Sequence, residues 1–406
     1  MRRIVLPNSL TVIVERRPSS SVAVEVSVGV GSSNESGREA GLSHFLEHML
    51  FNGSAKRPSA LSISNEIERL GGELNGGTSS EQTCFYAKVP SRFLDTALDV
   101  LSDMVLRPLF RPEDVEKERK VILNEIQLYT DDPKLHVWVL VQKHLFVKHP
   151  AGNPVYGRKE TIAKFSREDI AGFHRRHYVP GSMAVTIVGD VDVDRAVLLA
   201  SRYFAGMPDA SAPRLKLPKE VRQHERRVFR EKRRILQSYL VAACKTPPRG
   251  HPDSYALDVA HAILGRRSSG RMFDEIRNKR GLAYEVSVLH EAQRDVGIFA
   301  VSVIADKNNL GRTERIIHDE FRNLSLVTNP DVSEAKTFLE GDFLLECEDT
   351  LKRAELVGFF NHAAGARDVL AYLKRIRLVS AGDVRRVARK YLNGIYTLVI
   401  VEQRGG

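Results

Sequence analysis

The sequence predicts an α+β fold built from two homologous domains, each a largely antiparallel sheet packed with helices. Strand-like alternation of apolar residues, as at 10–14 and 22–28, occurs beside helix-like segments. These segments do not follow the strict strand–helix alternation that is typical of a parallel sheet. The order of segments in the first half also recurs in the second half, and a stretch rich in proline and small residues, 206–213, separates them.

The first half is expected to begin with strands and to continue into a helix. The basic segment 1–8 lacks the apolar core of a signal peptide, so we interpret it as the first strand. A Gly/Ser-rich turn at 31–34 then leads to a helix that carries two histidines and a glutamate.

The two halves end in the same way. Ser166 and Ser380 each stand three residues before an aspartate at the start of a predicted helix, where serine caps the first turn and the acid favours the helix dipole. A predicted strand follows in each half, at 184–188 and 397–401. An internal duplication explains this repetition. The predicted domains are 1–205 and 221–406, joined by a linker at 206–220.

The composition is that of an ordinary globular chain of 406 residues, with 42% hydrophobic and 28% charged residues. No apolar run is long enough to cross a bilayer, so we expect a cytoplasmic protein with no membrane partner. The cysteines form no C-x-x-C pair, so we expect buried, reduced thiols rather than a zinc finger or a disulfide framework. They are Cys84, Cys244 and Cys347.

The net charge of +10 raises the question of nucleic-acid binding. Basic residues cluster at 222–227 and 230–234, but acidic residues are mixed with them, and the sequence contains no recognisable nucleic-acid-binding motif. We therefore expect a solvated, arginine-rich surface and no nucleic-acid partner.

The strongest chemical signal is the run HFLEH at residues 44–48. On a helix, His44 and His48 lie on one face, at a separation that lets two imidazoles bind one zinc ion. Glu47 lies beside them, where its carboxylate can accept a proton from an attacking water molecule. This is the inverted H-x-x-E-H order. The alternative is a chance spacing of two core histidines and a surface glutamate, and a third ligand is needed to decide.

A third ligand is expected on the helical stretch 111–129. Glu118 and Glu125 are seven residues apart on this stretch and so share a face, which Val121 and Ile122 are expected to turn inward. The spacing alone does not choose between these two glutamates. Two others on the stretch are expected to be solvated, namely Glu113 and Glu116.

With these residues in place, the chain resembles the pitrilysin family, which includes insulin-degrading enzyme and the mitochondrial processing peptidases. That family has a glutamate ligand at the separation found here between His48 and Glu125, in a context like that of residues 118–126. The resemblance implies that Glu125 is the third zinc ligand and that Glu118 is a catalytic or supporting residue.

Two further motifs carry the resemblance. Residues 71–78 resemble the strand whose edge pairs with the substrate, which implies that Asn75 contacts the scissile region. Residues 276–284 resemble the family's Arg…Gly-Leu-Ala-Tyr motif. This motif implies that Arg277 and Tyr284 bind the substrate carbonyl and stabilise the developing oxyanion.

The resemblance covers nearly the whole chain, because residues 154–157 and 174–180 also resemble family landmarks. The chain departs from the family at Gly76, where alanine is usual, and at Phe85, where tyrosine is usual. Two arginines also replace glycines of a glycine-rich stretch, namely Arg266 and Arg267.

The resemblance implies a zinc metalloendopeptidase that acts on peptides or unfolded polypeptides and holds one Zn²⁺ per chain. Short two-domain members assemble as dimers around a chamber, so a homodimer is implied as well. One alternative is a non-catalytic scaffold subunit, but such members lose metal ligands or the Arg/Tyr pair, and this chain retains both. Another is a processing peptidase for basic presequences, which a chain of charge +10 repels at long range.

Overall fold

The structure is a computed structural model that describes residues 1–211, 213 and 217–404. Packing divides the chain into two compact units, each made of three segments. The first unit comprises Met1–Gln127, Asn153–Pro218 and Leu345–Val369, and the second comprises Leu128–Gly152, Lys219–Leu344 and Leu370–Gly406.

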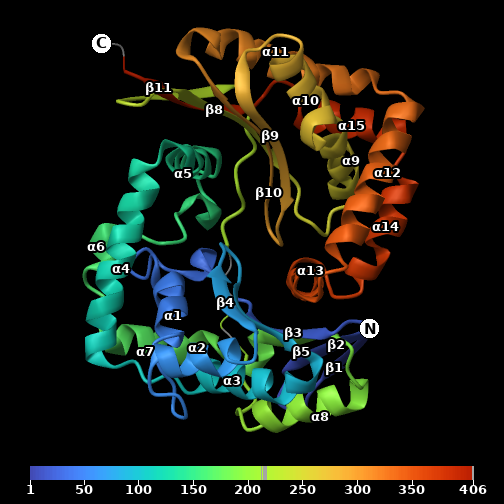
Figure 1. Cartoon of the computed structure of the whole chain (residues 1–406). Helices are drawn as coiled ribbons and strands as arrows, with labels where there is room; N and C mark the ends of the chain where they lie inside the picture. The colour runs from blue at the N-terminus through green and yellow to red at the C-terminus, as the bar shows by residue number, and fades with distance from the viewer. Residues whose placement is uncertain (212, 214–216, 405–406) are drawn as a thin grey trace. The chain divides into compact units, whose positions relative to one another are not determined.

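The first unit contains a six-stranded sheet (Figure 1). Its strands are β1 (Arg2–Val5), β2 (Thr11–Arg16), β3 (Ser21–Val28), β4 (Glu73–Thr78), β5 (Thr83–Pro90) and β6 (Met183–Gly189). Their order across the sheet is β1-β2-β6-β3-β5-β4, so β4 is an edge strand. Strands β2 and β6 run parallel, and the other neighbours run antiparallel.

The second unit contains a five-stranded sheet. Its strands are β7 (Arg227–Arg233), β8 (Ser238–Thr246), β9 (Ala283–Ala292), β10 (Gly297–Ala305) and β11 (Thr397–Gln403). The order β7-β11-β8-β10-β9, with β7 parallel to β11, repeats the order and directions of β2-β6-β3-β5-β4. The predicted α+β class with two similar, largely antiparallel sheets is therefore confirmed.

The helices cover these sheets. Those wholly or mostly in the first unit are α1 (Leu42–Leu50), α2 (Ala60–Glu68), α3 (Leu94–Leu106), α4 (Pro112–Asp131), α6 (Lys159–Ile162), α7 (Arg167–His177), α8 (Val193–Phe204) and α13 (Thr350–Ala363). Those wholly or mostly in the second unit are α5 (Pro133–Leu145), α9 (Asp253–Gly265), α10 (Arg271–Phe273), α11 (Leu310–Asn323), α12 (Asn329–Glu346), α14 (Asp368–Leu378) and α15 (Ala381–Tyr391). Within the described residues, none of the helices combines the length and the apolar character that crossing a membrane requires.

Two helices each belong to the unit that is built mainly from the other half of the sequence. Helix α5 comes from the first half and packs in the second unit, and α13 comes from the second half and packs in the first unit. Helix α5 packs on β8 and β11 through Val137 and Val141. Helix α13 packs on β3 and β6, where Leu351 and Ala354 bury apolar surface. Strands β8 and β11 correspond to β3 and β6, so each of the two helices covers the same pair of strands in its sheet. We call this arrangement the exchange of α5 and α13. The continuous domains 1–205 and 221–406 stay a prediction, and residues 212 and 214–216 of the predicted linker lie outside the described residues.

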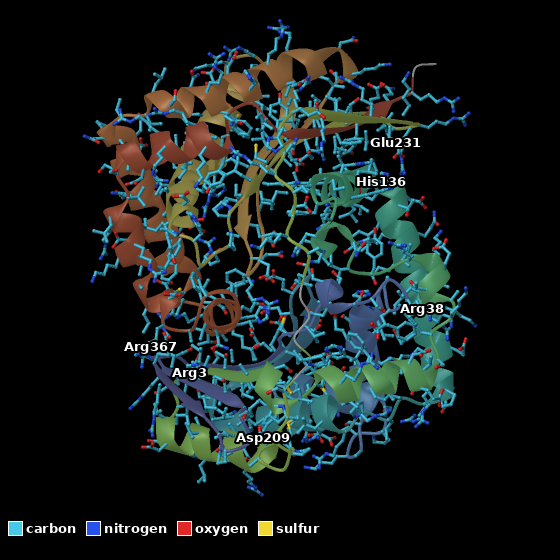
Figure 2. The ribbon with its side chains drawn as sticks, turned by 180° about the vertical axis from the view of Figure 1, so that it is seen from behind. Arg3, Arg38, His136, Asp209, Glu231 and Arg367 are labelled. Carbon is cyan, nitrogen blue, oxygen red and sulfur yellow. The ribbon has the colours of Figure 1, made fainter. Side chains whose placement is uncertain are left out.

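Polar contacts also hold α5 on its sheet, and Figure 2 labels two of the residues involved, His136 and Glu231. His136 Nε2 lies 3.1 Å from Glu231 Oε2 of β7, and the Arg233 guanidinium contacts both side chains. The ring of His144 stacks on Phe229 at a centroid distance of 3.6 Å. The helix is therefore fixed to the edge strand by polar contacts and by ring stacking as well as by its apolar face.

Several local expectations can be checked directly. Ser166 and Ser380 cap α7 and α15, each accepting the backbone N–H of the aspartate three residues on. The expectation that Val121 faces inward is wrong, because its side chain is 43% exposed whereas Ile122 is buried. All three cysteines are free; Cys244 and Cys347 are buried and Cys84 is half-buried.

Candidate metal centre

Helix α1 begins at a site shaped by two glycines and one carboxylate. Gly41 has φ of 97°, and a Cβ there would lie 2.8 Å from the Cα of Gly157, so the chain can pass Gly157 only without a side chain. The backbone N–H groups of Gly41 and Ser43 donate to the two oxygens of Glu35 at 2.7 Å each. Glu35 thus supplies the cap that Gly41 cannot provide.

The three expected ligands converge. Glu125 Oε2 lies 3.6 Å from His44 Nε2 and 3.6 Å from His48 Nε2. All three donor atoms lie within 4.8 Å of one another. Tetrahedral zinc with bonds of about 2.1 Å separates its ligand atoms by about 3.4 Å. The observed separations therefore fit a zinc ion better than hydrogen bonds between the side chains.

Glu118 orients His48. Its Oε2 lies 3.1 Å from His48 Nδ1, so the Nδ1–H donates to the carboxylate and Nε2 is left to act as a ligand. Glu118 is buried, and Asn52 donates to the His48 backbone carbonyl at 3.0 Å. The spacing did not distinguish the two glutamates, but their contacts do. Glu125 faces the Nε2 atoms of both histidines, whereas Glu118 contacts the Nδ1 atom of His48 on the other side of its ring.

The electrostatics of the site suit a cation. Burial lowers the pKa of His44 to about 4, so its imidazole is neutral, as a ligand must be. Burial opposes charge on His48 too, but the carboxylates of Glu118 and Glu125 outweigh it and raise the pKa of His48 to about 9. The carboxylates that favour a proton on His48 would equally favour a metal cation in place of that proton, and the donor set of two imidazoles and one carboxylate fits Zn²⁺.

Among the described residues, one oxygen of the Glu47 carboxylate has a hydrogen-bond partner. Thr78 Oγ1 of β4 donates to Glu47 Oε2 at 2.6 Å. Burial raises the pKa of Glu47, and the hydrogen bond from Thr78 opposes that rise. A carboxyl whose pKa is moved towards neutrality is suited to accept and return a proton near pH 7.

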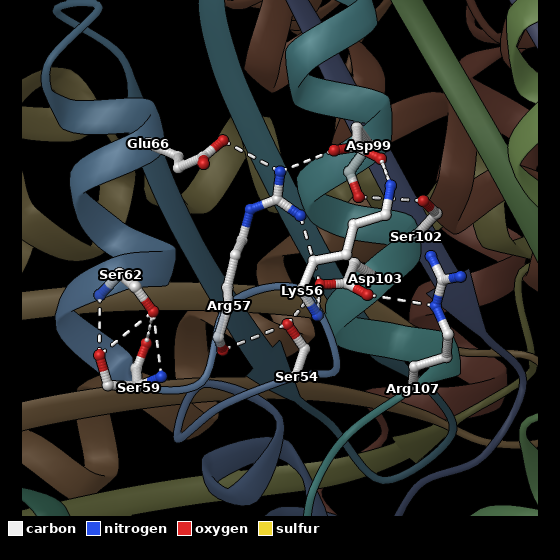
Figure 3. Close-up of polar contacts among 10 residues, drawn as sticks. All are labelled: Ser54, Lys56, Arg57, Ser59, Ser62, Glu66, Asp99, Ser102, Asp103 and Arg107. Carbon is white, nitrogen blue, oxygen red and sulfur yellow. Dashed lines mark hydrogen bonds and ion pairs between the residues drawn. The ribbon is translucent and has the colours of Figure 1, made fainter.

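The segment after α1 is fixed by the buried guanidinium of Arg57 (Figure 3). Its Nη2 contacts Glu66 at 2.9 Å and Asp99 at 2.7 Å, and its Nη1 contacts Asp103 at 3.3 Å. Ser54 donates to the same Asp103 carboxylate at 2.5 Å. This network ties the loop after α1 to α2 and α3.

The residues expected to bind substrate are divided between the two units. Asn75 is exposed on the edge strand β4, and its Oδ1 accepts the Gly76 N–H at 2.9 Å. Arg277 and Tyr284 belong to the second unit and touch each other: the guanidinium lies 4.6 Å from the Tyr284 ring centroid and 4.9 Å from that of Phe273. Tyr284 is 74% exposed, so the structure keeps this pair at a surface of its unit.

The two arginines that replace family glycines are paired with α12. Arg266 contacts Glu334 at 2.7 Å, and Arg267 contacts Asp342 at 3.1 Å. Arg267 has φ of 30°, a region in which glycine is favoured. The arginines thus form ion pairs in the second unit, and Arg267 does so in a backbone conformation that glycine adopts more easily. Neither arginine belongs to the metal centre.

Sequence reasoning did not single out three residues that build this centre: Glu35, Arg57 and Thr78. Glu35 caps a helix from six residues before Gly41, a spacing outside the usual capping patterns. Thr78 lies within the motif at 71–78, but only the fold brings its hydroxyl to Glu47.

Comparisons with known proteins place both halves of the chain in known families of domains. The family model for Insulinase (Peptidase family M16) matches residues 11–159, which include the whole metal centre. The model for Peptidase M16 inactive domain matches residues 164–339, which include Arg277 and Tyr284. The metal residues therefore lie outside the match that carries the word inactive.

Relatives cover the chain from end to end. A Mycobacterium bovis protein named an uncharacterized zinc protease is 34% identical, over 100% of this chain and 93% of that protein. A Bacillus subtilis protein of the same description is 29% identical, over 100% and 99%.

Solved structures share the fold. A protease from Helicobacter pylori has a TM-score of 0.92 at 21% identity, over 99% of both chains. A Pseudomonas fluorescens protein described as a peptidase M16 inactive domain has a TM-score of 0.89 at 20% identity, over 100% of this chain and 98% of that one. With a relative 34% identical along its whole length, this chain belongs to peptidase family M16, the insulinase family.

Proposed function

We propose that this protein is a zinc-dependent metalloendopeptidase that hydrolyses peptides or unfolded polypeptides, with one Zn²⁺ per chain. The convergence of His44, His48 and Glu125 carries the proposal. Glu118 fixes the His48 tautomer from behind. Relatives that are named uncharacterized zinc proteases support the same activity.

Each residue then has one task. Zn²⁺, when bound, supplies a Lewis acid that polarises a carbonyl and makes water acidic enough to attack at neutral pH. Glu47 accepts the proton of the attacking water and returns it to the leaving amine. Thr78 holds one oxygen of that carboxylate, which leaves the other oxygen for the proton.

The substrate side of the proposal rests on the edge strand β4. An extended peptide can add to this edge by backbone hydrogen bonds, with Asn75 beside the scissile region. Arg277 and Tyr284 would bind the substrate carbonyl and its developing negative charge. We further propose that a homodimer encloses the site in a chamber that admits only unfolded chains, and sedimentation of the active protein as a monomer would remove this part.

A non-catalytic scaffold is the alternative, and the geometry does not favour it. A scaffold has no need to keep three metal-ligating side chains, a glutamate that orients one of them and a carboxylate base together. Here all five lie on α1 and α4 of one unit.

The deciding experiment is Glu47→Gln, compared with Glu113→Gln, which changes an exposed glutamate on α4. Glu47→Gln should retain zinc and lose about 10²–10⁴-fold in kcat on an unstructured peptide, because the amide cannot accept a proton. Glu113→Gln should match the wild type in both. Wild-type kcat in the Glu47→Gln protein would overturn the role of Glu47, and a zinc-loaded wild type without peptidase activity would overturn the proposed function.

A further inference from the structure

The hydroxyl of Thr78 is committed to Glu47. Its Oγ1 lies 2.6 Å from Glu47 Oε2. The other nearby hydroxyl, that of Thr83, is 3.5 Å away and donates its own hydrogen to the Val30 carbonyl at 2.9 Å. The hydrogen of Thr78 therefore goes to the carboxylate, and among the described residues Glu47 Oε1 is left without a hydrogen bond.

Thr78 is also the last residue of β4, which has only β5 as a neighbour in its sheet. Gly76 and Thr78 share the face of β4 that lies against α1, where a Cβ at Gly76 would come within 3.2 Å of the Phe51 ring. The strand thus touches the end of α1 at Gly76 and the base itself at Thr78. An edge strand lacks half of its ladder hydrogen bonds, so its backbone is ordered further when a second strand pairs with it.

We propose that Thr78 is a positioning residue that links the occupied edge of β4 to the orientation of Glu47. A peptide paired along β4 fixes the backbone of that strand and with it the position of the Thr78 hydroxyl. The hydrogen bond from this hydroxyl then holds one oxygen of the Glu47 carboxylate in place. This inference rests on the proposed function, because it assumes that peptides pair with β4 and that Glu47 is the base. It adds a reason for long substrates to be cleaved faster: binding energy remote from the scissile bond improves the alignment of the base.

The test combines two variants with two substrates. Thr78→Val keeps the shape and removes the hydroxyl, whereas Thr78→Ser restores it. Thr186→Val is the matched control, because Thr186 is a buried threonine on β6 of the same sheet. Its hydroxyl has no hydrogen-bond partner in the part of the chain that the structure describes. Each protein is assayed for kcat, KM and zinc content with an extended peptide of at least ten residues and with a truncated peptide too short to span β4.

Thr78→Val should lower kcat on the long peptide about tenfold or more, a part of the about 10²–10⁴ that a positioned base contributes. Its kcat on the short peptide should fall less, so that the advantage of the long peptide shrinks. KM and zinc content should stay at wild-type values, Thr78→Ser should recover most of the loss, and Thr186→Val should behave as wild type.

Wild-type kcat in Thr78→Val would overturn the inference and leave the proposed function intact. An equal loss on both peptides would overturn the link to the occupied strand, and lost zinc or lost recovery in Thr78→Ser would reduce Thr78 to a structural residue. A zinc-loaded wild type that cleaves neither peptide would overturn the proposed function and this inference with it.

Discussion

Helices α1 and α9 occupy corresponding places, since α1 follows β3 and precedes β4, and α9 follows β8 and precedes β9. Both bury polar side chains, but they satisfy them differently. On α9, Asp258 accepts from Arg249 Nη1 at 2.6 Å and lies 2.7 Å from His290 Nδ1. On α1, His44 and His48 point their Nε2 atoms at Glu125 from 3.6 Å, too far for a normal hydrogen bond.

This difference shows how a buried polar cluster reveals its role. Burying a carboxylate costs free energy unless a partner satisfies it. Asp258 finds its partners within the protein, whereas His44 and His48 of α1 and Glu125 of α4 face a common point at separations that suit a metal ion better than hydrogen bonds. In the part of the chain that the structure describes, they form the only group with the geometry of a metal site. Residue types alone do not separate the two cases, because both clusters contain histidine and a carboxylate.

The largest effect should come from Glu125→Gln. Glu125 faces both imidazoles whereas Glu118 contacts one ring, so Glu125→Gln should reduce zinc affinity by more than Glu118→Gln. Loss of a residue that supports a ligand typically costs about 10–100-fold in metal affinity, which is the value expected for Glu118→Gln. Competition with a chromophoric chelator measures both, and the reverse order would exchange the roles of the two glutamates.

A change in the second unit should act on stability instead. Asp258→Asn leaves the buried guanidinium of Arg249 without its counter-charge, and breaking a buried ion pair costs about 3–5 kcal/mol. Denaturant unfolding should show that loss, while zinc affinity stays at the wild-type value. Weaker zinc binding with unchanged stability would contradict the contrast between α9 and α1.

Glu25 on β3 shows a third way to bury a carboxyl group, and its effect on stability should depend on pH. Burial, helped by nearby Glu355, raises the pKa of Glu25 from 4.5 to about 8. Between these two pH values the folded protein keeps a proton that the unfolded chain releases, so this contribution to stability falls as pH rises. One unit of pKa corresponds to about 1.4 kcal/mol, so the effect is a few kcal/mol at most.

Glu25→Gln carries no titratable proton at this position. The variant should therefore gain stability over the wild type steadily from pH 5 to pH 8, as measured by thermal unfolding at each pH. Glu355→Gln, which removes only the smaller cause, should show a weaker trend in the same direction. Parallel curves for Glu25→Gln and the wild type would mean that Glu25 is ionised in the folded protein.

Local sequence patterns predicted the helices and strands. The features that they did not predict depend on packing between distant segments of the chain. Alternating apolar residues gave strands at β2 and β3, and the Ser-x-x-Asp starts gave α7 and α15, because these signals lie within a few residues. The shared face of Glu118 and Glu125 followed from helix geometry alone. The prediction that Val121 faces inward was wrong, because the spacing of Glu118 and Glu125 does not show how wide the buried face of α4 is.

The partners of the centre were beyond such reasoning. Glu35 reaches α1 across an irregular loop, and Thr78 meets Glu47 only because β4 folds against α1. The places of α5 and α13 follow from packing between segments far apart in the chain. These features depend on contacts between residues far apart in the chain.

The places of α5 and α13 determine how late each unit can complete its packing while the chain is being synthesised on the ribosome. All six strands of the first sheet have been made by residue 189, yet the helix that covers β3 and β6 ends only at Ala363. Helix α5, in contrast, is made before any strand of the sheet that it covers. Neither unit can close until most of the chain has emerged, so a nascent or truncated chain keeps apolar surface open to aggregation or to chaperones.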